Sequence, residues 1–339
     1  MTTQQDKLYG KSPKRCSGRV STPLGDQVAE DRSVEASRAY KSLWIDHEPQ
    51  EIIVNELRRY VRECKGYGNG PLTGCRLSEH HQAGKSATMA RLKSVLAAER
   101  AAAGLEPNRH QVIIMELDSQ TSLKGVWQEI LQAMGDEYWD DTVSAKVLEK
   151  RIAKWVKDLS VDLLVIDEVQ HLDRKTTDAK LVTDRLKVFL NRGVVPLVLV
   201  GDEQADAFFS SNPKLRARLP KGLKLAPLDP INSKTDKRLF KQFCNSLNDA
   251  IFSLGFLAEK ADLNSGRMLS ALAEVSNGHV GRVARLFSIA FPEAVGRGAD
   301  RIEAYDLSKA VRTYAIGNGW IDHDPFVDWD ATISDSEGS

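Results

Sequence analysis

The amino-acid sequence predicts an α/β protein in which a parallel β-sheet is covered by helices and is followed by a smaller helical domain. The first observation is that apolar segments such as 112–117 and 161–166 do not alternate with polar residues, which is typical of parallel strands buried on both faces. The second is that segments with helical periodicity separate them. The third is that no convincing strand pattern follows Lys234.

The first half of the chain is predicted to alternate helices and strands after a polar beginning. Residues 1–40 are polar and rich in Lys and Arg near the start, and we expect them to form a disordered basic tail. The elements expected after this tail are a helix over 49–61, a strand over 74–77, a helix over 88–100, a strand over 112–117 and helices over 123–134 and 143–159.

The second half continues this alternation and then becomes entirely helical. The expected elements are a strand over 161–166, a helix over 181–191, a strand over 196–201, a fifth strand ending at 226–228, and helices over 235–254, 268–275, 280–291 and 302–316. The 339 residues suit about two domains. We expect a tail over 1–40, an α/β ATPase domain over 41–230, a helical lid domain over 231–317 and an acidic tail over 318–339.

Two carboxylates, Asp167 and Glu168, end the strand over 161–166. A buried strand that delivers this pair at its carboxyl end can hold Mg²⁺ with the first acid and polarise an attacking water with the second. Two acids in such a place are costly without a cation. We therefore expect Asp167 to be a metal ligand and Glu168 to be the catalytic base, as in the Walker B half of a nucleotide hydrolase.

The complementary Walker A half is predicted at Lys85 and Ser86, where a short strand meets a helix. Lys85 suits the β/γ-phosphates and Ser86 the metal, while backbone N–H groups and the helix N-terminus surround the phosphates. The expected nucleotide contacts are Gln82, Ala83, Gly84, Lys85, Ser86 and Ala87. The motif departs from G-x-x-x-x-G-K-[ST] because Glu79 replaces the first Gly, which puts a carboxylate near the phosphates unless it turns away. The alternative is a surface turn before a helix.

Composition excludes several other classes. The chain has 47 basic residues (Lys and Arg) and 47 acidic residues (Asp and Glu), so its formal net charge is zero. Any surface that binds nucleic acid must therefore come from local clustering of charge. The four cysteines lack C-x-x-C spacing, which argues against a zinc site and a disulfide framework and favours a reducing cytoplasm. No segment resembles a signal peptide or reaches the roughly 18 apolar residues of a spanning helix, so no membrane role is expected.

The motifs together resemble the TniB-like transposition ATPases of the AAA+ class, relatives of TnsC and MuB. The resemblance covers roughly residues 41 to 316. Its most specific part is the string Asp-Glu-Val-Gln-His-Leu at 167–172. Further matching strings, in the family's order, are Trp-Ile-Asp-His at 44–47, Val-Leu-Val-Gly at 198–201, Leu-Arg-Ala-Arg-Leu at 215–219 and Gly-His-Val-Gly-Arg-Val at 278–283.

The resemblance implies an ATPase that uses ATP and Mg²⁺ and whose active site is completed by a residue of a neighbouring subunit. Arg282, at the start of a lid helix, would lie near the phosphates in the sensor 2 position, and Arg216 or Arg218 would reach a neighbouring subunit's site. Asp202 stands where a Thr or Asn sensor 1 is usual, so slow hydrolysis is expected. Arg216 and Arg218 could instead form a solvated or DNA-facing basic surface, and Arg282 or Arg285 could be only a surface charge.

The resemblance also implies partners. Such proteins assemble on double-stranded DNA without reading its sequence, as ring or helical homo-oligomers, and mark the target for a transposase together with a target-selection protein. The loop after the second strand is the DNA contact we expect, through Gln120, Thr121 and Lys124, with Lys175 and Lys180 as competitors.

Two other functions remain open at the level of sequence. Glu79, Gln82 and Asp202 would suit a nucleotide-gated interaction protein with little or no hydrolysis. The general architecture would equally suit an AAA+ loader for another DNA process. His171, beside the acidic pair, is expected to cap or pack and not to catalyse.

Overall fold

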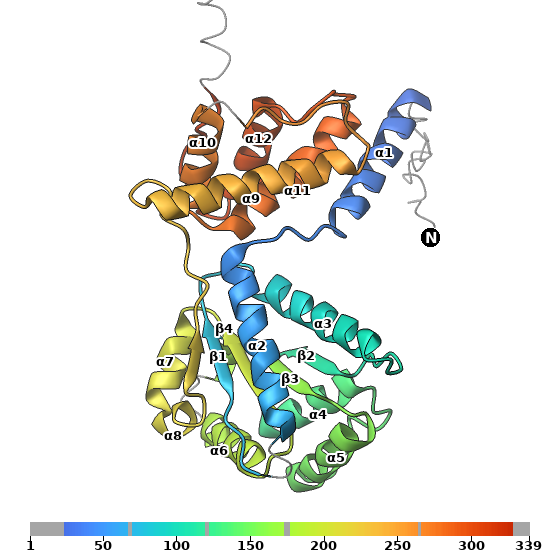
Figure 1. The fold of residues 1–339 in the computed structure, drawn as a ribbon, viewed down its shortest axis with the longest axis vertical. Coiled ribbons are helices and arrows are strands. Elements are labelled where there is room, and N and C mark those ends of the chain that lie inside the picture. Colours follow the sequence, from blue (N-terminus) through green and yellow to red (C-terminus); the bar gives the residue numbers. More distant parts are fainter. Residues whose placement is uncertain (1–23, 67–69, 119–121, 173–176, 264–265, 328–339) are drawn as a thin grey trace, which may run out of the picture.

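The computed structural model describes residues 24–66, 70–118, 122–172, 177–263 and 266–327. In Figure 1 the sheet and its helices form the lower part of the molecule, and a group of helices lies above the edge of the sheet. Each part has its own cluster of buried apolar residues. The predicted α/β fold with a helical lid is confirmed.

The sheet contains five parallel strands in the spatial order β2-β3-β4-β1-β5. Their bounds are β1 Cys75–Ser78, β2 Val112–Glu116, β3 Leu163–Asp167, β4 Leu197–Gly201 and β5 Lys221–Leu223. Every residue of β3 and β4 is buried, which explains why these two strands read as unbroken apolar runs. Because all strands are parallel, the segments that follow β1, β3 and β4 meet at one edge of the sheet.

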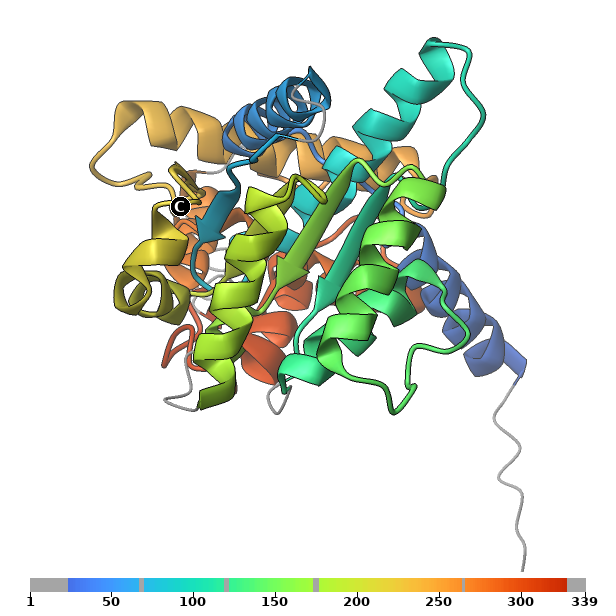
Figure 2. The same ribbon diagram turned by 90° about the horizontal axis from the view of Figure 1, so that it is seen from below.

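Helices cover both faces of this sheet, as the view from below shows (Figure 2). Trp127 and Phe189 stack in the core with ring centroids 4.8 Å apart, which joins two of these helices. The helices of this part are α2 Glu48–Gly66, α3 Lys85–Ala102, α4 Leu123–Met134, α5 Ala145–Asp158, the 3₁₀ turn η1 Val169–Leu172, α6 Thr177–Asn191, α7 Gln204–Ser211 and α8 Pro213–Arg216.

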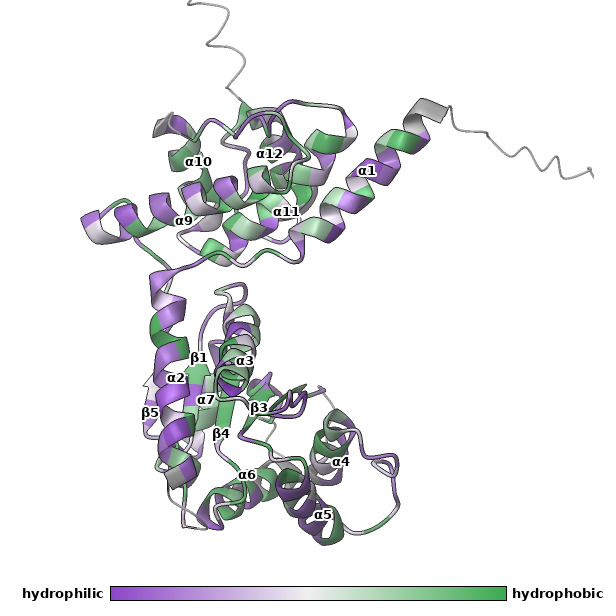
Figure 3. Cartoon of the chain, turned by 45° about the vertical axis from the view of Figure 1, so that its right-hand side comes forward, coloured by the Kyte–Doolittle hydropathy of each residue, from purple (hydrophilic) through white to green (hydrophobic). Residues whose placement is uncertain are grey.

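The lid consists of α9 Lys234–Ser253, α10 Gly266–Ser276, α11 Val280–Gly296, α12 Ala304–Ala310 and a π-helical turn, η2 Val311–Ala315. Among the described residues after β5 there is no strand, as predicted. Figure 3 shows that β3 and β4 are mainly hydrophobic, whereas α2 and α9 alternate hydrophilic and hydrophobic bands. The amphipathic lid helices bury Phe243, Phe287 and Phe291 in a core of their own.

The prediction of a disordered tail over 1–40 is wrong for its second half. Helix α1 spans Leu24–Tyr40 and packs along α11 of the lid (Figure 1). Its inward face is made of small residues, because Ala36 is buried and Ser33 lies beside Gly296. Such a face has no strong apolar periodicity, so the sequence pattern did not predict this helix. Residues 1–23 and 328–339 lie outside the described residues.

The expected fifth strand is present, but its predicted end at 226–228 is wrong, because β5 ends at Leu223. The backbone beyond it binds other partners. The Leu225 N–H donates to the Glu79 side chain, and the Leu228 N–H donates to the Gly278 carbonyl. This connection therefore joins the β1–α3 loop to the lid and does not extend the sheet.

Candidate functional site

The loop between β1 and α3 wraps around the ammonium group of Lys85. The Lys85 Nζ donates to the carbonyl oxygens of Glu79 at 2.5 Å and His80 at 3.0 Å. Gly84 (φ 94°) and Gln82 (φ 65°) both adopt left-handed backbone, which turns the chain into α3. Burial lowers the pKa of Lys85, and the carboxylate charges of Asp167 and Glu168 oppose this effect. The loop thus holds one cation at the start of a helix.

The acidic end of β3 lies beside this loop, as the sequence predicted. The Asp167 Oδ2 is 3.4 Å from the Ser86 Oγ, and the Asp167 Oδ1 accepts a hydrogen bond from the Glu168 N–H at 2.9 Å. Glu168 has φ 59°, a conformation that a non-glycine residue rarely adopts. The fold therefore brings hydroxyl, ammonium and two carboxylates together at the carboxyl edge of the sheet.

Two of the three unusual residues named above, Glu79 and Asp202, have structural partners. The Glu79 Oε1 accepts a hydrogen bond from the Leu225 N–H at 2.9 Å, so this carboxylate turns toward the connection to the lid. The Asp202 Oδ1 accepts from the Gln204 N–H at 2.8 Å at the start of α7. The Asp202 Oδ2 lies 3.3 Å from the His81 Nε2. Both acids are thus held by neighbouring groups.

Two glycines of the lid lie directly against the rest of the protein, Gly281 against the β1–α3 loop and Gly278 against the connection after β5. A Cβ atom on Gly281 would lie 1.9 Å from the Gln82 carbonyl oxygen, and one on Gly278 (φ 74°) would lie 1.8 Å from the Leu228 carbonyl oxygen. Only glycine permits this approach. The His279 ring meets the His80 ring with centroids 5.4 Å apart. Burial, reinforced by the positive charge of Arg282, lowers the pKa of His279 to about 4.

Three buried polar atoms at this junction have no hydrogen-bond partner among the described residues: Gln82 Oε1, His279 Nδ1 and Arg282 Nε. Instead, the Arg282 guanidinium lies over the Trp320 ring, 5.1 Å from its centroid. Buried polar groups without partners are costly, so their gathering beside Lys85 and the α3 N-terminus fits a polar, anionic ligand. The Ser86 hydroxyl and Asp167 carboxylate are oxygen ligands of the kind Mg²⁺ prefers. The residues therefore fit a nucleotide with its metal.

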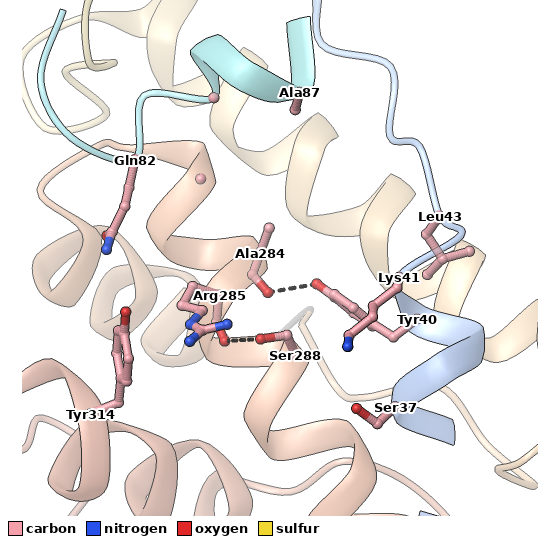
Figure 4. Close-up of a pocket in the computed structure, with 12 residues that line it drawn as sticks. Ser37, Tyr40, Lys41, Leu43, Gln82, Ala87, Ala284, Arg285, Ser288 and Tyr314 are labelled. Carbon is pink, nitrogen blue, oxygen red and sulfur yellow. Dashed lines mark hydrogen bonds between the residues drawn. The ribbon is translucent and has the colours of Figure 1, made fainter. Parts of the chain in front are cut away.

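A pocket of about 610 Å³ opens beside the loop, between α1, α3 and α11. Figure 4 shows Gln82 and Ala87 on one side and Tyr40, Lys41, Arg285 and Tyr314 across from them. The Tyr40 hydroxyl donates to the Ala284 carbonyl at 2.6 Å and closes one wall. The lining residues are Ser37, Tyr40, Lys41, Leu43, Gln82, Gly84, Ala87, Gly281, Ala284, Arg285, Ser288 and Tyr314.

Sequence reasoning missed most of this lining. Of its residues, Gln82, Gly84 and Ala87 were expected as nucleotide contacts, and the Trp-Ile-Asp-His string marked a neighbouring cavity of about 130 Å³ that is lined by Trp44 and Ile45. Tyr40 lies at the end of the helix that was expected to be disordered. One of Arg282 and Arg285 was expected to be only a surface charge, and Arg285 is exposed but also lines the larger pocket with its guanidinium over Tyr314.

The remaining predicted residues do not join this cluster. Arg216 is exposed on α8, and the Arg218 carbonyl accepts a hydrogen bond from the Gly74 N–H at 2.7 Å. That contact lies at the amino end of β1, opposite the end from which the β1–α3 loop leaves. Of the expected DNA contacts, Lys124 lies in the first turn of α4. Gln120, Thr121 and Lys175 lie outside the described residues, and Lys180 lies on α6.

Four features together define a P-loop protein of the AAA+ class. They are the order of the strands in the sheet, the β1–α3 loop around Lys85, the acidic end of β3 and the helical lid. Within this class the chain belongs to the TniB family. The family model described as Bacterial TniB protein matches residues 36–224, more than half of the chain. No curated protein matches the chain.

Several solved structures share the fold. The ORC2 protein of Aeropyrum pernix has a TM-score of 0.59 at 14% identity, over 81% of this chain and 71% of that one. Cdc6p from Pyrobaculum aerophilum has a TM-score of 0.59 at 12% identity, over 81% and 70%. The Aeropyrum pernix ORC1 protein, solved in complex with DNA, has a TM-score of 0.57 at 17% identity, over 79% and 66%. At such identities the similarity concerns the fold alone.

No helix within the described residues has the length and apolar character needed to cross a bilayer.

Proposed function

We propose that this chain is an ATP-dependent, DNA-binding regulator of DNA transposition, which assembles on target DNA and presents it to a transposase. The observation that carries the proposal is the grouping of Lys85, Ser86, Asp167 and Glu168 at one edge of the sheet, in a member of the TniB family. The proposal includes an α/β ATPase domain over 41–230 and a lid over 231–317, with tails on either side.

The residues of the β1–α3 loop would bind the phosphates of ATP. Lys85 would offset charge on the β- and γ-phosphates, and the N–H groups at the start of α3 would donate to the phosphate oxygens. Ser86 and Asp167 would hold Mg²⁺, which supplies charge neutralisation when bound. Glu168 would accept the proton of the attacking water. Arg282 would leave Trp320 to contact the phosphates from the lid.

Turnover is proposed to be slow. Asp202 follows β4, where a neutral side chain would orient the attacking water, but its carboxylate is engaged by His81 and the Gln204 N–H. The same feature favours a second candidate function, a nucleotide-gated interaction protein that hydrolyses little or no ATP. A turnover assay separates the two.

Assembly on DNA is proposed to complete the site. Arg216 or Arg218 would reach the γ-phosphate of a neighbouring subunit in a ring or helical oligomer. Their distance from this chain's own loop, at the other end of β1, supports a role between subunits. Gln120, Thr121 and Lys124 would contact phosphates of duplex DNA without reading bases, so binding would be tolerant of sequence and sensitive to salt. A transposase and a target-selection protein would be the further partners.

Sedimentation and ATPase assays, with and without duplexes of increasing length, test this proposal. We expect ATP to promote oligomers on any sufficiently long duplex and higher salt to dissolve them. Arg216→Ala or Arg218→Ala should weaken assembly and DNA-stimulated hydrolysis. Lys214→Ala, on the same helix, is the matched control for the loss of one positive charge.

Mixing experiments sharpen the assignment. Arginine variants mixed with Lys85→Ala should regain part of the activity, because some junctions then pair an intact loop with an intact arginine. A strict monomer whose turnover ignores DNA would overturn the transposition proposal and leave a P-loop ATPase of another process. Equal losses in Lys214→Ala and the two arginine variants would indicate a general basic surface in place of a subunit contact.

A further inference from the structure

Gln170 joins the end of β3 to the end of β4. Its Nε2 donates a hydrogen bond to the Glu168 Oε2, and its Oε1 accepts one from the Asp202 N–H at 3.2 Å. Asp202 follows β4 and Glu168 follows β3, so a single side chain spans the two strand ends that meet at the candidate site.

The backbone contact fixes which way the Gln170 amide faces. A backbone N–H can only donate, so the atom that meets Asp202 N must be the amide oxygen. The amide NH₂ group must then face the Glu168 carboxylate as a donor. Gly201 leaves the room for this arrangement, because a Cβ atom there would lie 2.7 Å from the Gln170 Oε1.

The turn that carries Gln170 is itself anchored. Its residues Val169 and Leu172 are buried. The His171 N–H donates to the Glu168 carbonyl at 3.0 Å, and the His171 Nδ1 lies 2.7 Å from the carbonyl oxygen of Leu117, just beyond β2. The Gln170 side chain therefore extends from a fixed support toward a carboxylate whose backbone is in the left-handed region.

We propose that Gln170 is the positioning residue of the catalytic base, holding the Glu168 Oε2 so that the Oε1 is left to accept a proton from water. This inference rests on the proposed ATPase function. In the step, the water oxygen bonds to the γ-phosphorus, its proton passes to Glu168, and the bond to the β-phosphate oxygen breaks to give ADP and phosphate. Gln170 takes no part in the proton transfer and acts only through Glu168.

Two near-isosteric variants of the full-length chain test the amide. Gln170→Met keeps the length of the side chain and removes both hydrogen bonds. Gln170→Glu can still accept from the Asp202 N–H but cannot donate to Glu168. Both should lower kcat by about 10- to 100-fold, by analogy with the losses found when outer-shell hydrogen bonds that orient metal-binding side chains are removed. The KM for ATP and the affinity for a labelled ATP analogue should stay within about twofold.

A double-mutant cycle separates positioning from general damage. In a Glu168→Gln background the base is absent, so adding Gln170→Met should cause no further loss of turnover. Equal additional losses in both backgrounds would overturn the inference, as would a parental kcat in Gln170→Met or Gln170→Glu. If Glu168→Gln itself hydrolyses ATP at the parental rate, the proposed base is wrong, and that result is distinct from a failure at Gln170.

Discussion

At the carboxyl end of the sheet, Lys85, Asp167 and Glu168 each have a hydrogen-bond partner, whereas the lid contributes His279 and Arg282, whose Nδ1 and Nε have none among the described residues. These three sheet-side groups are therefore held in place by hydrogen bonds within the protein. On the lid side, the Arg282 guanidinium rests on Trp320, and its Nε remains available for a hydrogen bond.

This difference follows from how each side is built. The sheet side consists of strand ends whose register is fixed by parallel pairing and whose groups bind one another. The lid side is the first turn of a single helix, α11, pressed on the loop through Gly281. We infer that the sheet side sets the chemistry and that the lid side senses whether a ligand is present.

The largest expected effect is on the sheet side. Lys85→Ala should weaken binding of a labelled ATP analogue by about 100-fold or more, near 2.7 kcal/mol, because the ammonium that offsets phosphate charge is lost. Lys93→Ala, an exposed lysine on the same helix, is the matched control and should bind normally. Titration by fluorescence anisotropy measures both. Parental affinity in the Lys85 variant would remove the phosphate-binding assignment.

The lid side should contribute less to binding. Arg282→Ala should weaken ATP binding by about tenfold, near 1.4 kcal/mol. Without ligand it should lower the free energy of unfolding by no more than about 1 kcal/mol, since the Arg282 Nε forms no hydrogen bond with the described residues and only the contact with the Trp320 ring is lost. Arg301→Ala removes the same charge elsewhere in the lid, where Arg301 pairs with Glu259, and should leave binding unchanged. Thermal shifts with and without nucleotide decide the outcome. A large loss of stability without ligand would show that Arg282 is a structural residue.

The smallest expected effect is a dependence of the free energy of unfolding on pH. Burial lowers the pKa of His279 and of His47 to about 4, from about 6.5 in the unfolded chain. The unfolded state therefore binds more protons between these values, so stability is fully present above pH 6.5 and falls as the pH drops toward 4. Protonation of each histidine in the unfolded state should lower the free energy of unfolding by about 1 kcal/mol between pH 7 and pH 5.5.

Denaturant unfolding at several pH values measures this effect. His279→Gln and His47→Gln should each remove part of the decline below pH 6.5, and the double variant should be the flattest. The same decline in the double variant as in the parent would show that other groups control the acid response. A decline that disappears in His47→Gln alone would assign the sensitivity to His47, which lines a small cavity together with Ala83 and His279.

The sequence was most informative where local patterns are strong. Strands β3 and β4 are buried along their length, so their apolar runs stood out, and the bounds expected for α4 match those observed. The pairing of Ser86 with Asp167 could be predicted, since motif spacing and parallel strands bring the two segments to one edge. The role of Arg216 or Arg218 between subunits stays a prediction.

Local patterns failed where contacts between distant segments decide the structure. Helix α1 has a face of small residues, which packs against Gly296 of α11. The sequence pattern of α1 alone does not predict this contact. The sequence left open whether the Glu79 carboxylate turns away from the phosphates, and the Leu225 N–H, far along the chain, holds it. The pocket between α1, α3 and α11 likewise needs three separated segments to exist.

The sequence by itself determined the class of fold and the chemical groups, because periodicity, burial and motif spacing are local properties of the chain. The tertiary structure alone decided where Glu79 points, that α1 joins the lid, and that Gln170 bridges Glu168 and the Asp202 backbone. Each depends on hydrogen bonds or packing between residues whose proximity arises only when the parallel sheet and the lid come together.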